Sequence, residues 1–163
     1  MADDLKSETT SVGELLQMVV FQLGGEEFGV EIMKVQEIIR MPEITKIPQS
    51  PEYVEGVINL RGKIIVVINL DKRFNLRSKE VDEHSRIIVV EIGNNVVGMI
   101  VDSVNEVLRI PASNIDPAPE LVTSSVSKEY ITGVGKMDNR LLILLDLAKV
   151  LNKKEVEDIA SLA

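Results

Sequence analysis

The side chains that could carry out chemistry are few, and their spacing argues against catalysis. A duplicated chain could pair two equivalent carboxylates, and Asp146 is the best candidate for one of them. An internal repeat with an offset of 77 residues, however, places Asp146 opposite Asn69. An aspartic peptidase shares one proton between two equivalent acids. Here one partner is an amide, and neither residue lies in an Asp-Thr/Ser-Gly turn. We therefore expect no such site.

Histidine and cysteine chemistry is equally limited. His84 is the only histidine, it lies in a charged stretch, and the chain has no cysteine. A single imidazole excludes a His-rich metal site and leaves no Ser-His-Asp set outside that stretch. The sequence predicts no catalytic residue, no metal and no cofactor. A hydrolase with an unrecognised site remains an alternative, and it would need a deep polar pocket with titrating acids.

The strongest local motif is the turn Gly56-Val57-Ile58-Asn59-Leu60-Arg61-Gly62-Lys63 between two apolar segments. Gly62 aligns with Asn139 of the repeat, and both residue types readily adopt left-handed backbone geometry. Arg61 aligns with Asp138, so shared turn chemistry does not explain its guanidinium. It would form a structural ion pair with an acid such as Glu37, or bind a partner's carboxylate or carbonyls beside an apolar groove. The two roles are compatible.

The aliphatic residues Ile32, Val35 and Ile38 have two interpretations. Aliphatic side chains on strands belong to the core more often than to an interface. The strands of a small barrel cannot all face inwards, however, and an apolar strip left on a sheet surface would mark a protein contact. A binding module is therefore favoured over an enzyme.

The elements that position these residues are predicted to be short strands. Residues 18–23 and 27–32 alternate around Gly24-Gly25, which is typical of a hairpin. Forty residues are Val or Ile, against three Phe and two Tyr, an excess that favours pleated sheet over helix. Runs without alternation, such as 64–68, indicate strands buried on both faces. Further strands are expected at 35–39, 86–92, 96–101, 104–108 and 141–145.

An internal duplication organises the chain. Glu52–Val57 aligns with Glu129–Val134 at an offset of 77, and Val35–Pro42 aligns with Val104–Pro111 at an offset of 69. We predict two five-stranded barrels packed on a shared apolar core, at about 18–76 and 86–151, with the chain crossing between them at the ends. Residues 1–17 are expected to be a flexible tail, and residues 152–163 a short docked helix or a tail.

Composition narrows the functional class. The chain has 163 residues and a net charge of -8, which repels phosphate backbones and anionic membranes. Its N-terminus is acidic and polar, and no apolar run reaches the length of a membrane span. We expect a cytoplasmic protein that neither binds nucleic acid nor inserts into a membrane.

Several motifs together resemble one known family. Phe28-Gly29-Val30, Val35-Gln36-Glu37-Ile38, Glu55–Gly62, Val97–Asp102, Ile115–Pro119 and Tyr130–Gly135 are similar in order and spacing to CheW, the coupling protein family of bacterial chemotaxis. The resemblance spans roughly residues 18–151. It implies an all-β fold, with short helices, of two SH3-like five-stranded barrels, and it implies no catalytic activity.

The resemblance also implies partners. Members of this family join the histidine kinase CheA, through its homologous regulatory domain, to the cytoplasmic tip of chemoreceptors. The kinase contact would use Val19, Ile32 and Val35, and a second kinase contact would use Asp116, Glu120 and Leu121. Receptor binding would use the groove between the barrels, with Glu37, Ile38, Asn59 and Arg61.

The same resemblance predicts a monomer when free, recruited to receptor arrays at the inner face of the membrane. The alternative keeps the fold and changes the role: an adaptor of a related chemosensory pathway, or a regulatory domain that serves another kinase.

Overall fold

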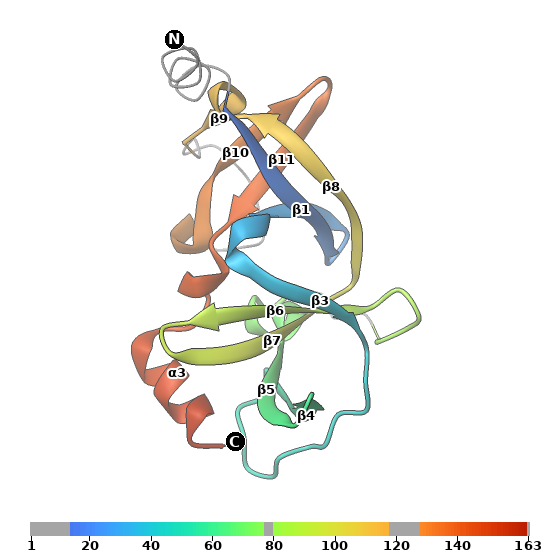
Figure 1. The fold of residues 1–163 in the computed structure, drawn as a ribbon, viewed down its shortest axis with the longest axis vertical. Helices are drawn as coiled ribbons and strands as arrows, with labels where there is room; N and C mark the ends of the chain where they lie inside the picture. The colour runs from blue at the N-terminus through green and yellow to red at the C-terminus, as the bar shows by residue number, and fades with distance from the viewer. Residues whose placement is uncertain (1–13, 77–79, 118–127, 163) are drawn as a thin grey trace.

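Eleven strands in two curled sheets make up most of the computed structural model, which describes residues 14–76, 80–117 and 128–162. One sheet has the strand order β3-β6-β7-β5-β4 and the other β8-β1-β2-β11-β10-β9. Each sheet curls into an SH3-like barrel that keeps two end strands, and the barrels lie one above the other (Figure 1). We call the first the central barrel and the second, built from both ends of the chain, the terminal barrel.

The central barrel contains five strands from the middle of the sequence. They are β3 (Val35–Arg40), β4 (Val54–Leu60), β5 (Lys63–Asn69), β6 (Arg86–Ile92) and β7 (Asn95–Val101). The terminal barrel contains β1 (Leu15–Leu23), β2 (Glu26–Glu31), β8 (Ser103–Pro111), β9 (Ile115–Asp116), β10 (Ile131–Met137) and β11 (Arg140–Leu145).

The barrels do not coincide with the sequence repeats, so the expected boundaries at 18–76 and 86–151 are wrong as barrel limits. Each repeat places its first hairpin in the other barrel: β1 and β2 join β8, β10 and β11, whereas β6 and β7 join β3, β4 and β5. A repeat identifies equivalent segments, but it does not specify which copies pair. Pairs of β1 with β8 therefore have equivalents between β6 and β3, such as Val19 with Val107 and Ile88 with Ile38.

Irregularities recur at equivalent positions, which confirms the duplication. The β1–β8 register shifts between Val20 and Phe21, and the β3–β6 register shifts at the matching step between Val35 and Glu37. Bulges distort strands in reproducible ways and re-aim the side chains beside them. The bulge in β3 directly precedes Glu37, so it sets the direction of a predicted site residue.

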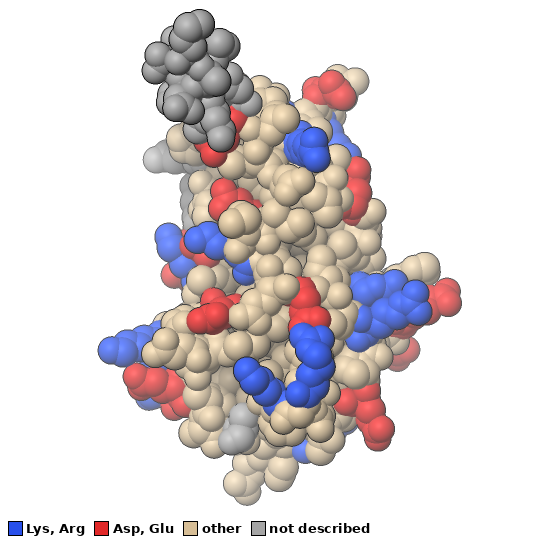
Figure 2. Space-filling view, in the orientation of Figure 1, with Lys and Arg blue, Asp and Glu red and all other residues tan. Residues whose placement is uncertain are grey.

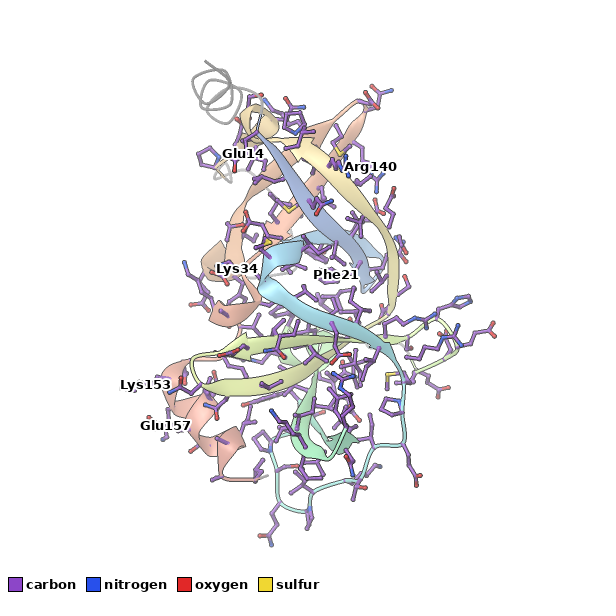
Figure 3. The ribbon with its side chains drawn as sticks, in the orientation of Figure 1. Glu14, Phe21, Lys34, Arg140, Lys153 and Glu157 are labelled. Atoms are coloured by element: carbon purple, nitrogen blue, oxygen red, sulfur yellow. The ribbon has the colours of Figure 1, made fainter. Side chains whose placement is uncertain are left out.

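Strands buried on both faces explain the runs that do not alternate. In β6, Ile87 and Val89 fill the central barrel, whereas Ile88 and Val90 face a core shared by both barrels. In β1, Met18 and Val20 fill the terminal barrel, and Val19 and Phe21 face the shared core. Phe21 lies in the middle of the molecule (Figure 3). The predicted joining of the two cores is correct.

The chain ends in a docked helix, one of the two expected alternatives. Helix α3 (Lys153–Ala160) begins with a capping box, in which Asn152 and Glu155 bind each other's backbone N–H. Val156 and Ile159 are buried and belong to the shared core. The helix lies beside the central barrel (Figure 1). At the other end, β1 begins at Leu15, so residues 15–17 are strand rather than tail, and residues 1–13 lie outside the described residues.

Candidate functional site

A bidentate ion pair joins two strands of the central barrel. Arg61 lies in the β4–β5 turn, and its guanidinium donates to the Glu37 carboxylate on β3, with 3.2 Å from Nη1 to Oε2 and a second bond from Nη2 to Oε1. The Arg61 side chain is 71% exposed and the Glu37 side chain 28% exposed. Because Arg61 satisfies the carboxylate directly, it lowers the pKa of Glu37. The predicted ion pair exists, and most of the Arg61 side chain still faces solvent.

Backbone geometry and one side-chain hydrogen bond hold the turn that carries Arg61. Arg61 has a φ of 51° and Gly62 a φ of 86°, as the two central residues of a tight hairpin of this kind require. The Asn59 side-chain oxygen accepts a hydrogen bond of 2.8 Å from the Gly62 N–H. Asn59 therefore stabilises the turn, which is a supporting role for one of the predicted receptor residues.

Ile38 lies on the opposite face of β3 from Glu37. No register shift separates the two residues, so their side chains alternate. Ile38 pairs with Ile88, which faces the shared core, so Ile38 borders the seam between the barrels and is 36% exposed. The structure thus groups Glu37, Asn59 and Arg61 and places Ile38 on the other face. Because β3 is the last strand of its sheet, both faces meet at one edge.

On the face of the molecule that Figure 2 shows, the charged side chains are dispersed rather than gathered into one patch. Acidic and basic groups lie next to one another over the central barrel, separated by uncharged surface (Figure 2). Such a mixture suits short, specific contacts with another protein more than attraction to a polyanion.

The predicted kinase residues fall into three situations. Val19 has no exposed surface, because its side chain packs in the core shared by both barrels, so it cannot be the surface contact that was predicted. Ile32 and Val35 are half-buried where the chain crosses between barrels, and they pack against the same core. Asp116 ends β9 and pairs with Lys136 at 2.7 Å. Glu120 and Leu121 lie outside the described residues.

Two hollows flank the chain crossing, and sequence reasoning missed both. Val35 helps to line one of about 220 Å³, next to Met33, whose exposed fraction of 88% is exceptional for methionine. The other, of about 300 Å³, has an apolar floor that includes Leu16 and Leu144 and a rim that includes Lys34. Both form between segments distant in sequence, so no local pattern signals them. An exposed methionine next to a hollow is an adaptable contact for a partner.

The side chains considered for chemistry have other surroundings or roles in the structure. Among residues 14–76, 80–117 and 128–162, no three His, Asp or Glu side chains are grouped so that they could hold a metal ion. Within the same ranges, no helix is both long enough and apolar enough to cross a bilayer. His84 is exposed beside Glu83. Asn69 and Asp146 cap the elements that follow β5 and β11, accepting hydrogen bonds from the backbone of Lys72 and Ala148.

Two joined barrels with a braced, solvent-facing arginine and shallow apolar hollows define the class of the protein as a protein-binding scaffold. Its particular family is shown by comparison: the chain belongs to the CheW-like family of chemotaxis adaptors, whose domain profile matches residues 17–155. The "Chemotaxis protein CheW" of Klebsiella aerogenes is 41% identical over 140 residues, which cover 86% of this chain and 84% of that relative.

Other relatives agree. The "Chemotaxis protein CheW" of Treponema pallidum is 35% identical over 153 residues, which cover 91% of this chain and 89% of the relative. The crystal structure of the scaffolding protein TtCheW from Thermoanaerobacter tengcongensis superimposes with a TM-score of 0.79 at 40% identity, covering 88% of this chain and 93% of that one. The predicted fold class and family are confirmed.

Proposed function

We propose that this protein couples the histidine kinase CheA to the cytoplasmic tips of chemoreceptors and has no catalytic activity of its own. Membership of the CheW-like family supports this role. The observation that carries it is Arg61, whose guanidinium Glu37 orients and whose side chain remains 71% exposed. An arginine held in this way has donors left for a partner's carboxylate or backbone carbonyls.

The receptor would lie along the free edge of β3. A receptor tip is an antiparallel helical hairpin, and a helix can place an aliphatic ridge against Ile38 while a charged group at its margin binds Arg61. An edge strand makes both faces reachable at once, which reconciles the opposite directions of Ile38 and Glu37.

The kinase regulatory domain would contact the chain crossing. Ile32 and Val35 are half-buried there, and Met33 beside them is almost fully exposed. Asp116, with a side chain 50% exposed, would contribute to a second kinase contact on the terminal barrel. Each contact is small, so many adaptors, kinases and receptors in one array would supply avidity. In this role the protein is a cytoplasmic monomer that is recruited to arrays at the inner membrane face.

Calorimetric titration tests the proposal. The full chain is titrated with a CheA regulatory domain and with a receptor tip hairpin, separately and together. We expect both to bind and a ternary complex to form. Arg61→Asp should weaken receptor binding, whereas Arg109→Asp, the same charge change on an exposed residue of β8 in the terminal barrel, should not. If neither partner binds the wild-type chain, the proposed function is wrong and only the fold and family remain.

A further inference from the structure

A single arginine lies between two equivalent tyrosines at the seam between the barrels. Arg73 ends helix α2 (Leu70–Arg73), and its guanidinium carbon lies 5.4 Å from the ring centre of Tyr53 and 5.9 Å from that of Tyr130. Tyr53 and Tyr130 are related by the offset of 77 residues, so each repeat supplies one ring. Both distances are within the range of cation–π attraction.

Hydrogen bonds connect the same guanidinium to three separate segments. Its Nε donates to the Val150 carbonyl at 3.0 Å, and its Nη2 donates to the Tyr130 hydroxyl at 3.3 Å and to Glu155 Oε1 at 3.0 Å. Glu155 belongs to α3, and its other oxygen accepts from the Tyr53 hydroxyl at 3.5 Å. One side chain of the central barrel therefore binds the residue before β10, the segment after β11 and the C-terminal helix.

This network is asymmetric in an otherwise symmetric arrangement. The position equivalent to Arg73 in the second repeat is Val150, which supplies a backbone carbonyl instead of a cation. The shared core around it is apolar, and apolar packing is non-directional. The hydrogen bonds of a planar guanidinium are directional, and the Arg73 side chain is only 21% exposed, which limits competition from water.

We propose that Arg73 is a positioning residue that fixes the relative orientation of the two barrels, and with it the shape of the seam that Ile38 borders. The shared core holds the barrels together, and Arg73 selects one angle between them. The consequence for receptor affinity rests on the proposed function, whereas the orientation itself does not.

The absence of cysteine makes the orientation measurable. Cysteines replace Asn94 in the β6–β7 turn and Ser113 beside β8, both exposed and on different barrels, and spin labels on them report the inter-barrel distance distribution. We expect one narrow distribution for the parent and a broader or displaced one for Arg73→Leu. Arg109→Leu, which removes an exposed arginine from β8, should leave the distribution narrow.

Arg73→Lys separates positioning from simple stabilisation. Lysine keeps a cation beside Glu155 but lacks the planar set of donors, so we expect the unfolding temperature to recover while the distribution stays broad. An unchanged distribution in Arg73→Leu, or in Arg73→Lys should the leucine variant fail to fold, would overturn the proposal. A lower unfolding temperature with an unchanged distribution would also overturn it.

The partner residue on α3 gives an independent comparison. Glu155→Gln removes the charge but keeps the capping box, because glutamine also serves at that position. It should broaden the distribution, whereas Glu157→Gln, at a site on the outer side of α3 (Figure 3), should not. We expect Arg73→Leu to lower affinity for a receptor tip hairpin roughly 2- to 30-fold. If the wild-type chain binds no receptor, the proposed function fails, and the distance measurement still decides the role of Arg73.

Discussion

Each barrel pairs an equivalent glutamate with an arginine, but the two arginines lie at different positions of the repeat. Glu37 and Glu106 are equivalent, but Asp138 occupies the position of Arg61, and the terminal barrel uses Arg140, two residues further along. Arg140 binds Glu106 at 3.1 Å and Glu27 at 3.2 Å and is 35% exposed. Two carboxylates bind Arg140, whereas Arg61 has one and is twice as exposed. Arg140 therefore has a structural role, whereas Arg61 keeps hydrogen-bond donors for a partner.

The aliphatic surroundings do not distinguish the barrels. Ile64 and its counterpart Leu141 are 51% and 66% exposed, and Ile38 and its counterpart Val107 are 36% and 49% exposed. Exposed apolar surface alone would therefore predict equal roles. The difference in charge pairing is what should give the barrels different partners.

A second difference concerns the end of each barrel. In the central barrel, Glu55 binds Lys72 at 2.8 Å and Asn69 at 3.2 Å. Thr132 and Asp146 replace Glu55 and Asn69 in the terminal barrel, and they line the hollow of about 300 Å³. The ion pair of Glu55 and Lys72 occupies this position in the central barrel, whereas the equivalent position in the terminal barrel borders a hollow.

The largest expected effect concerns two equivalent glycines. A Cβ at Gly56 would lie 2.1 Å from the Thr45 carbonyl oxygen, at a φ of 149°, whereas a Cβ at Gly133 would lie 2.7 Å from the Asp116 oxygen. We expect Gly56→Ala to cost about 3 kcal/mol or more and Gly133→Ala about 1–3 kcal/mol, because only the first combines a clash with backbone strain. Urea unfolding measures both, and equal losses would show that the barrels tolerate this change alike.

Val35 and Val104 test whether the chain crossing is the kinase contact. Both are half-buried, equivalent by the offset of 69, and packed against the shared core. A glutamate at either site should cost a similar free energy of unfolding, about 1–3 kcal/mol. Only Val35→Glu should abolish binding of a CheA regulatory domain in calorimetry. Loss of binding in both variants would mean that damage to the shared core causes the loss, and that the chain crossing is not the contact.

The two arginines should respond differently to charge reversal. Arg61→Asp should weaken receptor binding by about 30-fold, with little change in unfolding. Arg140→Asp should instead lower the free energy of unfolding by about 1 kcal/mol, because it adds a third carboxylate to Glu27 and Glu106. Calorimetry and urea unfolding of both variants check the contrast, which fails if Arg140→Asp is the one that affects the receptor.

The smallest effect is a change in the titration of Glu37. Arg61 lowers the pKa of Glu37, so Arg61→Gln should raise that pKa toward the ordinary glutamate value. An acid whose pKa is lowered by folding stabilises the folded state at pH values above its ordinary pKa. This stabilisation is lost as the pH falls through the lowered pKa. The pair is therefore intact at neutral pH and breaks in acid. Carbon-detected NMR titration of the Glu37 carboxyl measures the shift, and an unchanged pKa in Arg61→Gln would contradict the pairing.

Sequence reasoning reached the features that local patterns encode. Continuous aliphatic runs predicted strands buried on both faces, and the charge of Arg61 in a turn predicted its pairing with Glu37. It predicted Val19 as a contact residue, because no local pattern shows that the other barrel covers this side of β1. It missed Arg140, because the alignment pointed to Asp138 at the equivalent position. The exchange of hairpins and the hollow beside Met33 depend on contacts between distant segments, which no local pattern records.

The exchanged hairpins have a consequence for how the molecule acquires its structure. Neither repeat, produced alone, contains the strands of a complete barrel, so each would leave strands without neighbours and apolar faces in water. Closing the terminal barrel requires pairs such as Val19 with Val107, which are far apart along the chain and slow to meet. We expect the two barrels to form in a single cooperative transition, and a chain cut between the repeats to recover its structure only when both pieces are present.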